Sequence, residues 1–282
     1  MYQKQPSGGR SMKKELENKI ANSVELTHGS LFSGIGGFEL GAERAGIPTI
    51  WNCEIDEHKR KILRRHFPQA IQYEDITTME NPPYVDIISG GFPCQDISIA
   101  QNKFKNDKTK YYGIHGKRSG LWSEFNRLIR NVRPKYVLIE NSAMLPFRGL
   151  EYVLCDLWKS GYNAEWQTLS AAMFGYPHLR KRCFIVAYSV QERLDRGHEY
   201  FECLQEILRS RPPRQISLSM PLERLNPARM RYDIRIIDGF FRGLDKRRIE
   251  DCGNAVIPSI TEYLFNSIKE FEAKKQHKKQ MI

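Results

Sequence analysis

The chain has 282 residues, of which 40% are hydrophobic and 27% are charged. This balance is typical of a globular protein with its own core and excludes an intrinsically disordered chain. The longest apolar runs, such as residues 137–139, are too short to cross a membrane. Residues 1–22 are polar and basic and lack the apolar segment of a secretory signal, so we expect a cytoplasmic protein.

The chain is basic, with 44 Lys and Arg against 33 Asp and Glu and a net charge of +11. Residues 101–135 hold ten basic side chains and two acidic ones. Such a stretch favours a polyanionic partner, nucleic acid first, although a solubilising surface would have the same composition.

The predicted elements alternate along the chain from residue 24 onwards. Short apolar runs predict strands over 26–32, 49–53, 85–90, 136–140 and 183–188. Amphipathic stretches predict helices over 36–46, 57–66, 119–131, 149–159 and 258–273. Strand and helix in alternation at this spacing predict an α/β fold with a doubly wound sheet.

The alternation stops near residue 190, where the chain becomes rich in Arg and Pro. We therefore expect a small separate module after the main domain, followed by a helix that returns to that domain. The expected units are a flexible basic leader 1–22, a catalytic domain 23–189, the module 190–246, a C-terminal helix 247–272 and a Lys-rich tail 273–282.

A glycine-rich segment, residues 31–41, follows the first predicted strand and opens a helix. Glycines permit a tight turn and a close approach of a ligand to the backbone. The spacing differs from the dinucleotide fingerprint, which favours a nucleoside without pyrophosphate, such as S-adenosylmethionine. Glu54 ends the next strand, where it is placed to hold two ribose hydroxyls. Asp75 suits an adenine amino group with Ile76 on the ring, although a loop or cap aspartate is the alternative.

Cys94 follows the predicted strand 85–90 in the sequence Gly-Gly-Phe-Pro-Cys. This corner presents the thiol at the carboxyl edge of the sheet, where open α/β sheets bind ligands. Helix-start amides just after it would favour a thiolate. A small buried hydrophobe is the alternative for any cysteine, and we assign this role to the other five.

The cysteine spacing indicates neither a metal site nor a disulfide framework. No pair has the spacing of a zinc site, so we predict no bound metal, and disulfides are not expected. The six cysteines are Cys53, Cys94, Cys155, Cys183, Cys203 and Cys252.

Two further motifs end at the same predicted edge. The strand 136–140 delivers Glu140, a plausible general acid beside a thiolate. Arg180 and Arg182 have the period of two that places side chains on one face of a strand, where guanidinium groups suit a base carbonyl and a phosphate. The alternatives are a capping glutamate and a surface basic cluster.

Taken in order, these motifs resemble those of the C5-cytosine DNA methyltransferases of bacterial or phage type, over about residues 26–189 and 245–268. The resemblance implies a Rossmann-like S-adenosylmethionine-dependent methyltransferase fold with a small target-recognition domain. It implies Cys94 as nucleophile and Glu140, Arg180 and Arg182 in the base pocket. The implied cofactor site comprises Phe32, Ser33, Gly34, Gly36, Glu54, Ile55, Asp75, Ile76, Pro93, Asn254 and Val256.

The resemblance further implies methyl transfer from S-adenosylmethionine to C5 of a flipped cytosine in double-stranded DNA, through a covalent bond from Cys94 to C6. We expect a monomer; a cognate restriction endonuclease and a solitary enzyme both stay open. Two alternative functions also stay open: an RNA cytosine methyltransferase of the same superfamily and a non-catalytic DNA-binding regulator. The chain departs from the family pattern at Glu74, where glycine is usual. The expected DNA-backbone contacts are Lys103, Lys105, Lys108, Lys110, Lys117 and Arg118.

Overall fold

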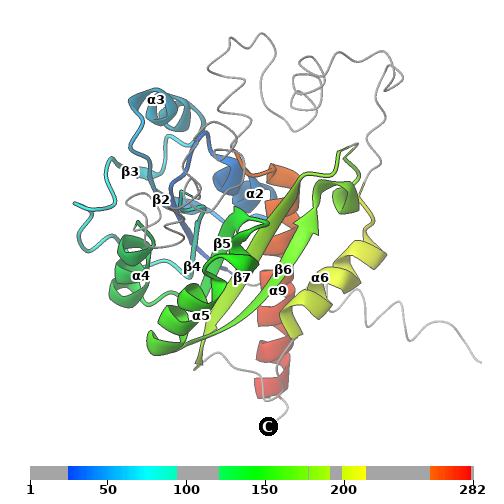
Figure 1. Cartoon of the computed structure of the whole chain (residues 1–282). Helices are drawn as coiled ribbons and strands as arrows, with labels where there is room; N and C mark the ends of the chain where they lie inside the picture. The colour runs from blue at the N-terminus through cyan, green and yellow to red at the C-terminus, as the bar shows by residue number, and fades with distance from the viewer. Residues whose placement is uncertain (1–24, 94–120, 177, 191–198, 214–254, 281–282) are drawn as a thin grey trace, which may run out of the picture.

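The computed structural model describes residues 25–93, 121–176, 178–190, 199–213 and 255–280. Its seven strands form one sheet in the order β3-β2-β1-β4-β5-β7-β6 (Figure 1). Strands β1 to β5 pair in parallel, and β7 runs antiparallel to both of its neighbours. This arrangement confirms the predicted α/β class. The strands are β1 His28–Leu31, β2 Thr49–Cys53, β3 Ile71–Tyr73, β4 Ile87–Gly90, β5 Tyr136–Ser142, β6 Tyr162–Ser170 and β7 Lys181–Ser189.

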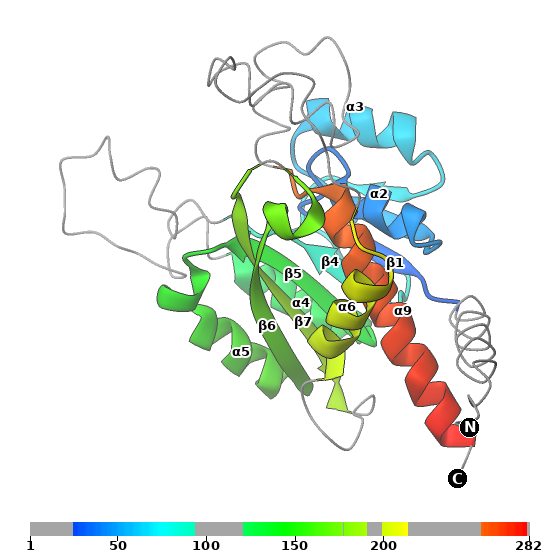
Figure 2. The ribbon, with the colours of Figure 1, turned by 90° about the vertical axis from the view of Figure 1, so that its right-hand side faces the viewer.

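Helices cover both faces of the sheet. The helices α2, α6 and α9 pack together on one face, and α4 and α5 lie on the other (Figures 1 and 2). The helices are α2 Gly37–Arg44, α3 Glu57–His66, α4 Leu121–Val132, α5 Leu150–Lys159, α6 Glu199–Ser210 and α9 Pro258–Gln280, with short 3-10 turns η3 Leu145–Phe147 and η4 Ala171–Phe174. No helix in this described part is both long and apolar enough to cross a membrane.

Residues 136–139 of the central strand β5 are apolar without interruption because both faces of the strand are buried. Successive side chains of a strand point to opposite faces, and both faces of this sheet are covered. Tyr136 and Leu138 therefore join the core beneath α2, α6 and α9, while Val137 and Ile139 join the core beneath α4 and α5. All four side chains are fully buried.

Part of the segment 190–246, which was expected to be a separate module, packs against the main domain. Its residues 199–210 form α6, which buries Tyr200, Cys203 and Leu204 in the same core as α9. The Tyr200 hydroxyl donates to the carbonyl of Leu264 in α9, at 2.7 Å. This helix therefore belongs to the main domain, because its apolar face is covered by that domain. Residues 191–198 and 214–246 of this segment lie outside the described residues.

The last helix, α9, is longer than predicted and ties the C-terminal segment to the start of the chain. It continues to Gln280, so most of the expected Lys-rich tail is helical, and Lys275 is buried. The Thr261 hydroxyl donates to the carbonyl of Gly37 in α2, at 3.1 Å. A Cβ atom on Gly41 would overlap the Thr261 side chain, so a glycine allows the two helices to approach this closely.

Candidate cofactor and base site

Five loops meet at the carboxyl edge of the sheet. The chain leaves β1 toward β2 and β3, whereas it leaves β4 toward β5, so the direction of winding reverses between β1 and β4. Open α/β sheets bind their ligands at such a switch point, beyond the carboxyl ends of the strands. The loops after β1 to β4 carry, in turn, Ser33, Glu54, Asp75 and Pro93, and Glu140 lies within β5, near its carboxyl end.

The loop after β1 has an unusual backbone. Phe32, Gly34 and Gly36 have φ angles of 53°, 58° and 93°. The left-handed region is uncommon for phenylalanine and is held by the surrounding structure, as often happens at ligand sites. A Cβ atom on Gly36 would lie 2.6 Å from the Phe67 ring, so only glycine fits there. Ser33 lies buried beneath this turn, and its amide donates to the carbonyl of Cys53.

Glu54 connects this glycine loop to β2. Its Oε2 accepts the amide of Gly34 at 2.7 Å, and its Oε1 accepts the amide of Asp56 at 3.0 Å. The residue is only 7% exposed. The carboxylate is therefore held in one direction by two backbone donors. Its neighbour Ile55 is 72% exposed, which is unusual for an isoleucine and leaves an apolar surface beside that carboxylate.

The loop after β3 carries Asp75 and Ile76, the two residues expected at the adenine ring. Asp75 Oδ1 accepts both the amide and the hydroxyl of Thr77, at 2.9 Å each, which is the capping role considered as the alternative. Ile76 is 4% exposed and packs into the core beneath α4, so it offers little surface to a ring.

The loop after β4 is fixed by Asn141, to which the sequence analysis gave no role. The side-chain amide of Asn141 donates to the carbonyl of Phe92, at 3.1 Å, and both residues are buried. The signal for it is the polar side chain that directly follows Glu140 in an otherwise apolar strand. Pro93 is the last described residue of this loop. Cys94 lies outside the described residues, as do Asn254 and the predicted DNA contacts Lys103, Lys105, Lys108, Lys110, Lys117 and Arg118.

Glu140 and Arg182 form an ion pair at the end of β5. Arg182 Nε lies 2.8 Å from Glu140 Oε1, although this oxygen is buried and accepts no hydrogen bond. Arg182 is 33% exposed on its side chain, compared with 12% for Glu140. The pair is therefore open to solvent on the arginine side.

Arg180 lies on the same face of the chain but has a different partner. Its Nη2 donates to the carbonyl of Ala255, at 2.7 Å. The two arginines line one small pocket, and Arg180 joins this pocket to the segment that leads into α9. The pocket is lined by Leu169, Arg180, Arg182, Phe184, Val256, Ile257 and Ile260.

A buried acid beneath the glycine loop was not identified from the sequence. Glu39 lies in the first turn of α2, is fully buried, and neither of its carboxylate oxygens has a hydrogen bond of good geometry. Burial raises the pKa of Glu39 to about 7. An acidic residue in a first helical turn is ordinarily a solvent-exposed partner of the helix N-terminus, so the sequence pattern hides its burial.

Comparison with known proteins points to one family. The C-5 cytosine-specific DNA methylase family matches residues 26–228. The type II methyltransferase M2.BsuMI of Bacillus subtilis is 34% identical over 177 residues, which are 59% of this chain and 43% of the relative. M.Eco47II of Escherichia coli is 36% identical over 193 residues, which are 65% of this chain and 44% of the relative. The chain thus spans less than half the length of these two relatives.

Solved structures agree on the fold. A methyltransferase encoded within an E. coli prophage superposes with a TM-score of 0.60 at 18% identity, over 86% of this chain and 98% of the other. The Entamoeba histolytica methyltransferase EhMeth gives a TM-score of 0.55 at 18% identity, over 87% and 99% of the two chains. Together with the match over residues 26–228, the sheet order and the loops at its carboxyl edge place the chain in the C-5 cytosine-specific DNA methylase family.

Proposed function

We propose that the chain transfers a methyl group from S-adenosylmethionine to C5 of cytosine in double-stranded DNA. The observation that carries this proposal is the meeting of three loops at one sheet edge. Glu54 is held by the Gly34 amide on one side, and Glu140 is paired with Arg182 on the other. Between them Asn141 holds the carbonyl of Phe92, which lies two residues before Cys94 in the sequence.

Each proposed cofactor residue would contact a different part of S-adenosylmethionine. Glu54 would accept hydrogen bonds from the ribose hydroxyls, Ile55 would cover the adenine ring, and Asp75 Oδ2 would accept from its amino group. The sulfonium end would lie at the glycine loop, beside Phe32. When bound, S-adenosylmethionine supplies an electrophilic methyl group.

The base residues account for activation of cytosine. C5 of cytosine is a poor nucleophile, and attack of the Cys94 thiolate on C6 moves an electron pair toward C5. Glu140, which is paired with Arg182 before a base arrives, would take up a proton, donate a proton or hydrogen bond to N3 and so stabilise the charge that attack creates. C5 then takes the methyl group, a base removes the C5 proton, and the bond from sulfur to C6 breaks to restore the ring.

The polymer site follows from the basic segments. A stacked base cannot reach Cys94, so the cytosine must be flipped out of the duplex. Residues 101–118 supply six basic side chains for phosphates, and Arg side chains of the segment 190–246 suit guanine in the major groove. The names of the relatives support a place beside a cognate restriction endonuclease. The proposal includes a monomeric enzyme in a prokaryotic or phage-infected cytoplasm.

The test is transfer of tritiated methyl groups to double-stranded DNA and, separately, to tRNA. We expect labelled DNA and unlabelled tRNA; the reverse would establish the RNA-directed alternative. DNA binding without label on either polymer would establish the regulator. DNA that contains 5-fluorocytosine should trap the protein covalently, because fluorine cannot leave C5 as a proton does.

A further inference from the structure

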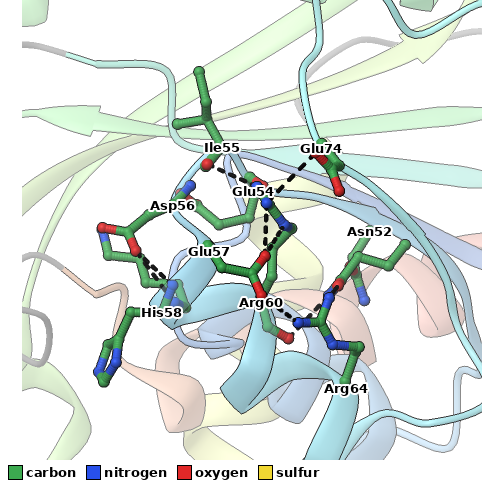
Figure 3. A network of polar contacts seen from close by, with 11 residues as sticks. Asn52, Glu54, Ile55, Asp56, Glu57, His58, Arg60, Arg64 and Glu74 are labelled. Carbon is green, nitrogen blue, oxygen red and sulfur yellow. Dashed lines mark hydrogen bonds and ion pairs between the residues drawn. The ribbon is translucent and has the colours of Figure 1, made fainter.

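Arg60 is a buried cation between the two loops that carry the proposed cofactor contacts (Figure 3). It lies in the first turn of α3, and its side chain is 9% exposed. Burial of a charged group is unfavourable unless hydrogen bonds and opposite charges compensate for the lost water. The partners of Arg60 therefore indicate what its burial accomplishes.

Two of these partners are backbone carbonyls of the loop after β2. Arg60 Nη1 donates to the carbonyls of Glu54, at 3.0 Å, and Ile55, at 2.7 Å. These peptide groups lie on either side of the point where the Ile55 side chain leaves the backbone, and directly after the Glu54 side chain. Because the carbonyls are fixed, the directions of the carboxylate and of the exposed isoleucine are fixed with them.

The other partners are two carboxylates. Arg60 Nε donates to Glu57 Oε2 at 3.0 Å, and Nη2 lies 2.6 Å from the same oxygen. Nη2 also lies 3.5 Å from Oε2 of Glu74, in the loop after β3. Glu74 directly precedes Asp75 and stands where the family usually has glycine. One guanidinium group therefore contacts both cofactor loops.

We infer that Arg60 is a positioning residue for S-adenosylmethionine, an inference that rests on the proposed function. It fixes the distance between the ribose carboxylate of Glu54 and the adenine acceptor Asp75 and needs no contact with the cofactor. The planar fork of arginine reaches two carbonyls and two carboxylates at once, whereas a lysine ammonium on the same backbone is a single point of charge. A lysine at position 60 would therefore keep the positive charge but could not contact both cofactor loops at once.

The chain offers a matched control one turn further along α3. Arg64 binds the same Glu57 through its other oxygen, at 2.7 Å, and donates to the Gln72 side chain at 2.7 Å. It is 48% exposed on its side chain, and these two contacts are to side chains alone. A change of Arg64 to lysine thus perturbs the same helix and the same glutamate without touching the backbone of either cofactor loop.

The experiment compares Arg60→Lys with Arg64→Lys in the full chain. Arg60→Lys should raise the Kd for S-adenosylmethionine, measured by calorimetry, and its KM by about tenfold, the equivalent of one lost charge-assisted hydrogen bond. The kcat at saturating cofactor and the KM for DNA should stay within about twofold, the pattern of lost binding rather than lost chemistry. Arg64→Lys should leave all four quantities unchanged within that limit.

Equal cofactor affinity in the two variants would overturn the inference, and so would a loss in Arg60→Lys shared by the cofactor and DNA constants. If Arg60→Lys does not fold, Glu74→Gln decides: it should raise the cofactor Kd by about two- to threefold, as expected for one exposed ion pair. An unchanged Kd would overturn the inference. A wild-type protein that binds no S-adenosylmethionine would instead contradict the proposed function.

Discussion

The two halves of the candidate site are held in place by different kinds of contact. On the β1–β3 side, backbone amides hold the Glu54 carboxylate and an arginine holds the backbone around it. On the β4–β7 side, Glu140 is held by the side chain of Arg182, which is itself partly exposed. Backbone donors cannot change partner without refolding the loop, whereas a side-chain pair can exchange partners when a base arrives. If the proposed function is correct, the cofactor half is organised before binding, whereas the base half can rearrange.

The strongest test of this division is Cys94→Ala. We expect no detectable methyl transfer, because C5 is not activated without the thiolate, while the Kd for S-adenosylmethionine stays within about threefold. Methyl transfer assays and calorimetry on one preparation measure the two quantities. Near wild-type turnover by the alanine variant would show that another group activates the base.

A second test concerns the fully buried Glu39 beneath the glycine loop. Its pKa of about 7 in the folded protein exceeds its ordinary value of 4.5, so the fold favours the protonated form. The unfolded chain releases this proton first, so the free energy of unfolding should fall as pH rises from 4.5 through 7. Each unit of pKa difference corresponds to about 1.36 kcal/mol, so the free energy of unfolding should fall by about 3 kcal/mol in total.

Glu39→Gln should remove this loss, because glutamine does not titrate. Urea unfolding at several pH values from 4.5 to 8 measures it, and the difference between variant and wild type cancels the titration of all other groups. Glu43→Gln, at an exposed position of the same helix, is the control. Parallel stability curves for Glu39→Gln and wild type would show that the buried acid does not titrate in this range.

A third test is Glu54→Ala, which removes the proposed ribose acceptor, the carboxylate held by the amides of Gly34 and Asp56. A hydrogen bond to a charged group contributes about 1.5–3 kcal/mol, so the Kd for S-adenosylmethionine should rise by roughly ten- to a hundredfold. Covalent trapping on 5-fluorocytosine DNA at saturating cofactor should persist. Unchanged cofactor affinity in calorimetry would move the cofactor away from this loop.

Much of the fold follows from apolar periodicity, and β2 and α3 begin and end where the sequence predicts. The signals for β6 and α6 were present but were not used. Tyr162, Ala164 and Trp166 alternate with polar residues, as in a half-buried strand. In α6, Tyr200, Cys203, Leu204 and Ile207 have the spacing of one helical face, hidden because neighbouring Arg and Pro residues made the whole segment look irregular.

The site was less predictable, for a physical reason. Motifs locate groups at the ends of strands, and the sheet brings Glu54 and Glu140 to one edge as expected. They do not show which side chains hold those groups, because Arg60 and Asn141 act through backbone carbonyls that any residue provides. Burial of Glu39 is likewise a tertiary effect, because its carboxyl group lies beside Ser30 and Ser33, outside its own helix.

The smallest expected effect belongs to Asn141, which supports the base half without belonging to it. Its amide holds the carbonyl of Phe92, two residues before Cys94, and nothing in that contact touches the cofactor loops. Asn141→Ala leaves a buried carbonyl without its donor, which costs about 1–3 kcal/mol, and frees the loop that leads to the proposed nucleophile. We expect kcat to fall about tenfold while the Kd for S-adenosylmethionine is unchanged. Single-turnover kinetics measure the first quantity and calorimetry the second. Asn141→Asp keeps the size but replaces the amide donor with an oxygen that faces the carbonyl, so it should lose at least as much as alanine. If instead the cofactor Kd rose with the fall in kcat, the two halves would be one mechanical unit, and the contrast between backbone-held and side-chain-held groups would carry no functional meaning.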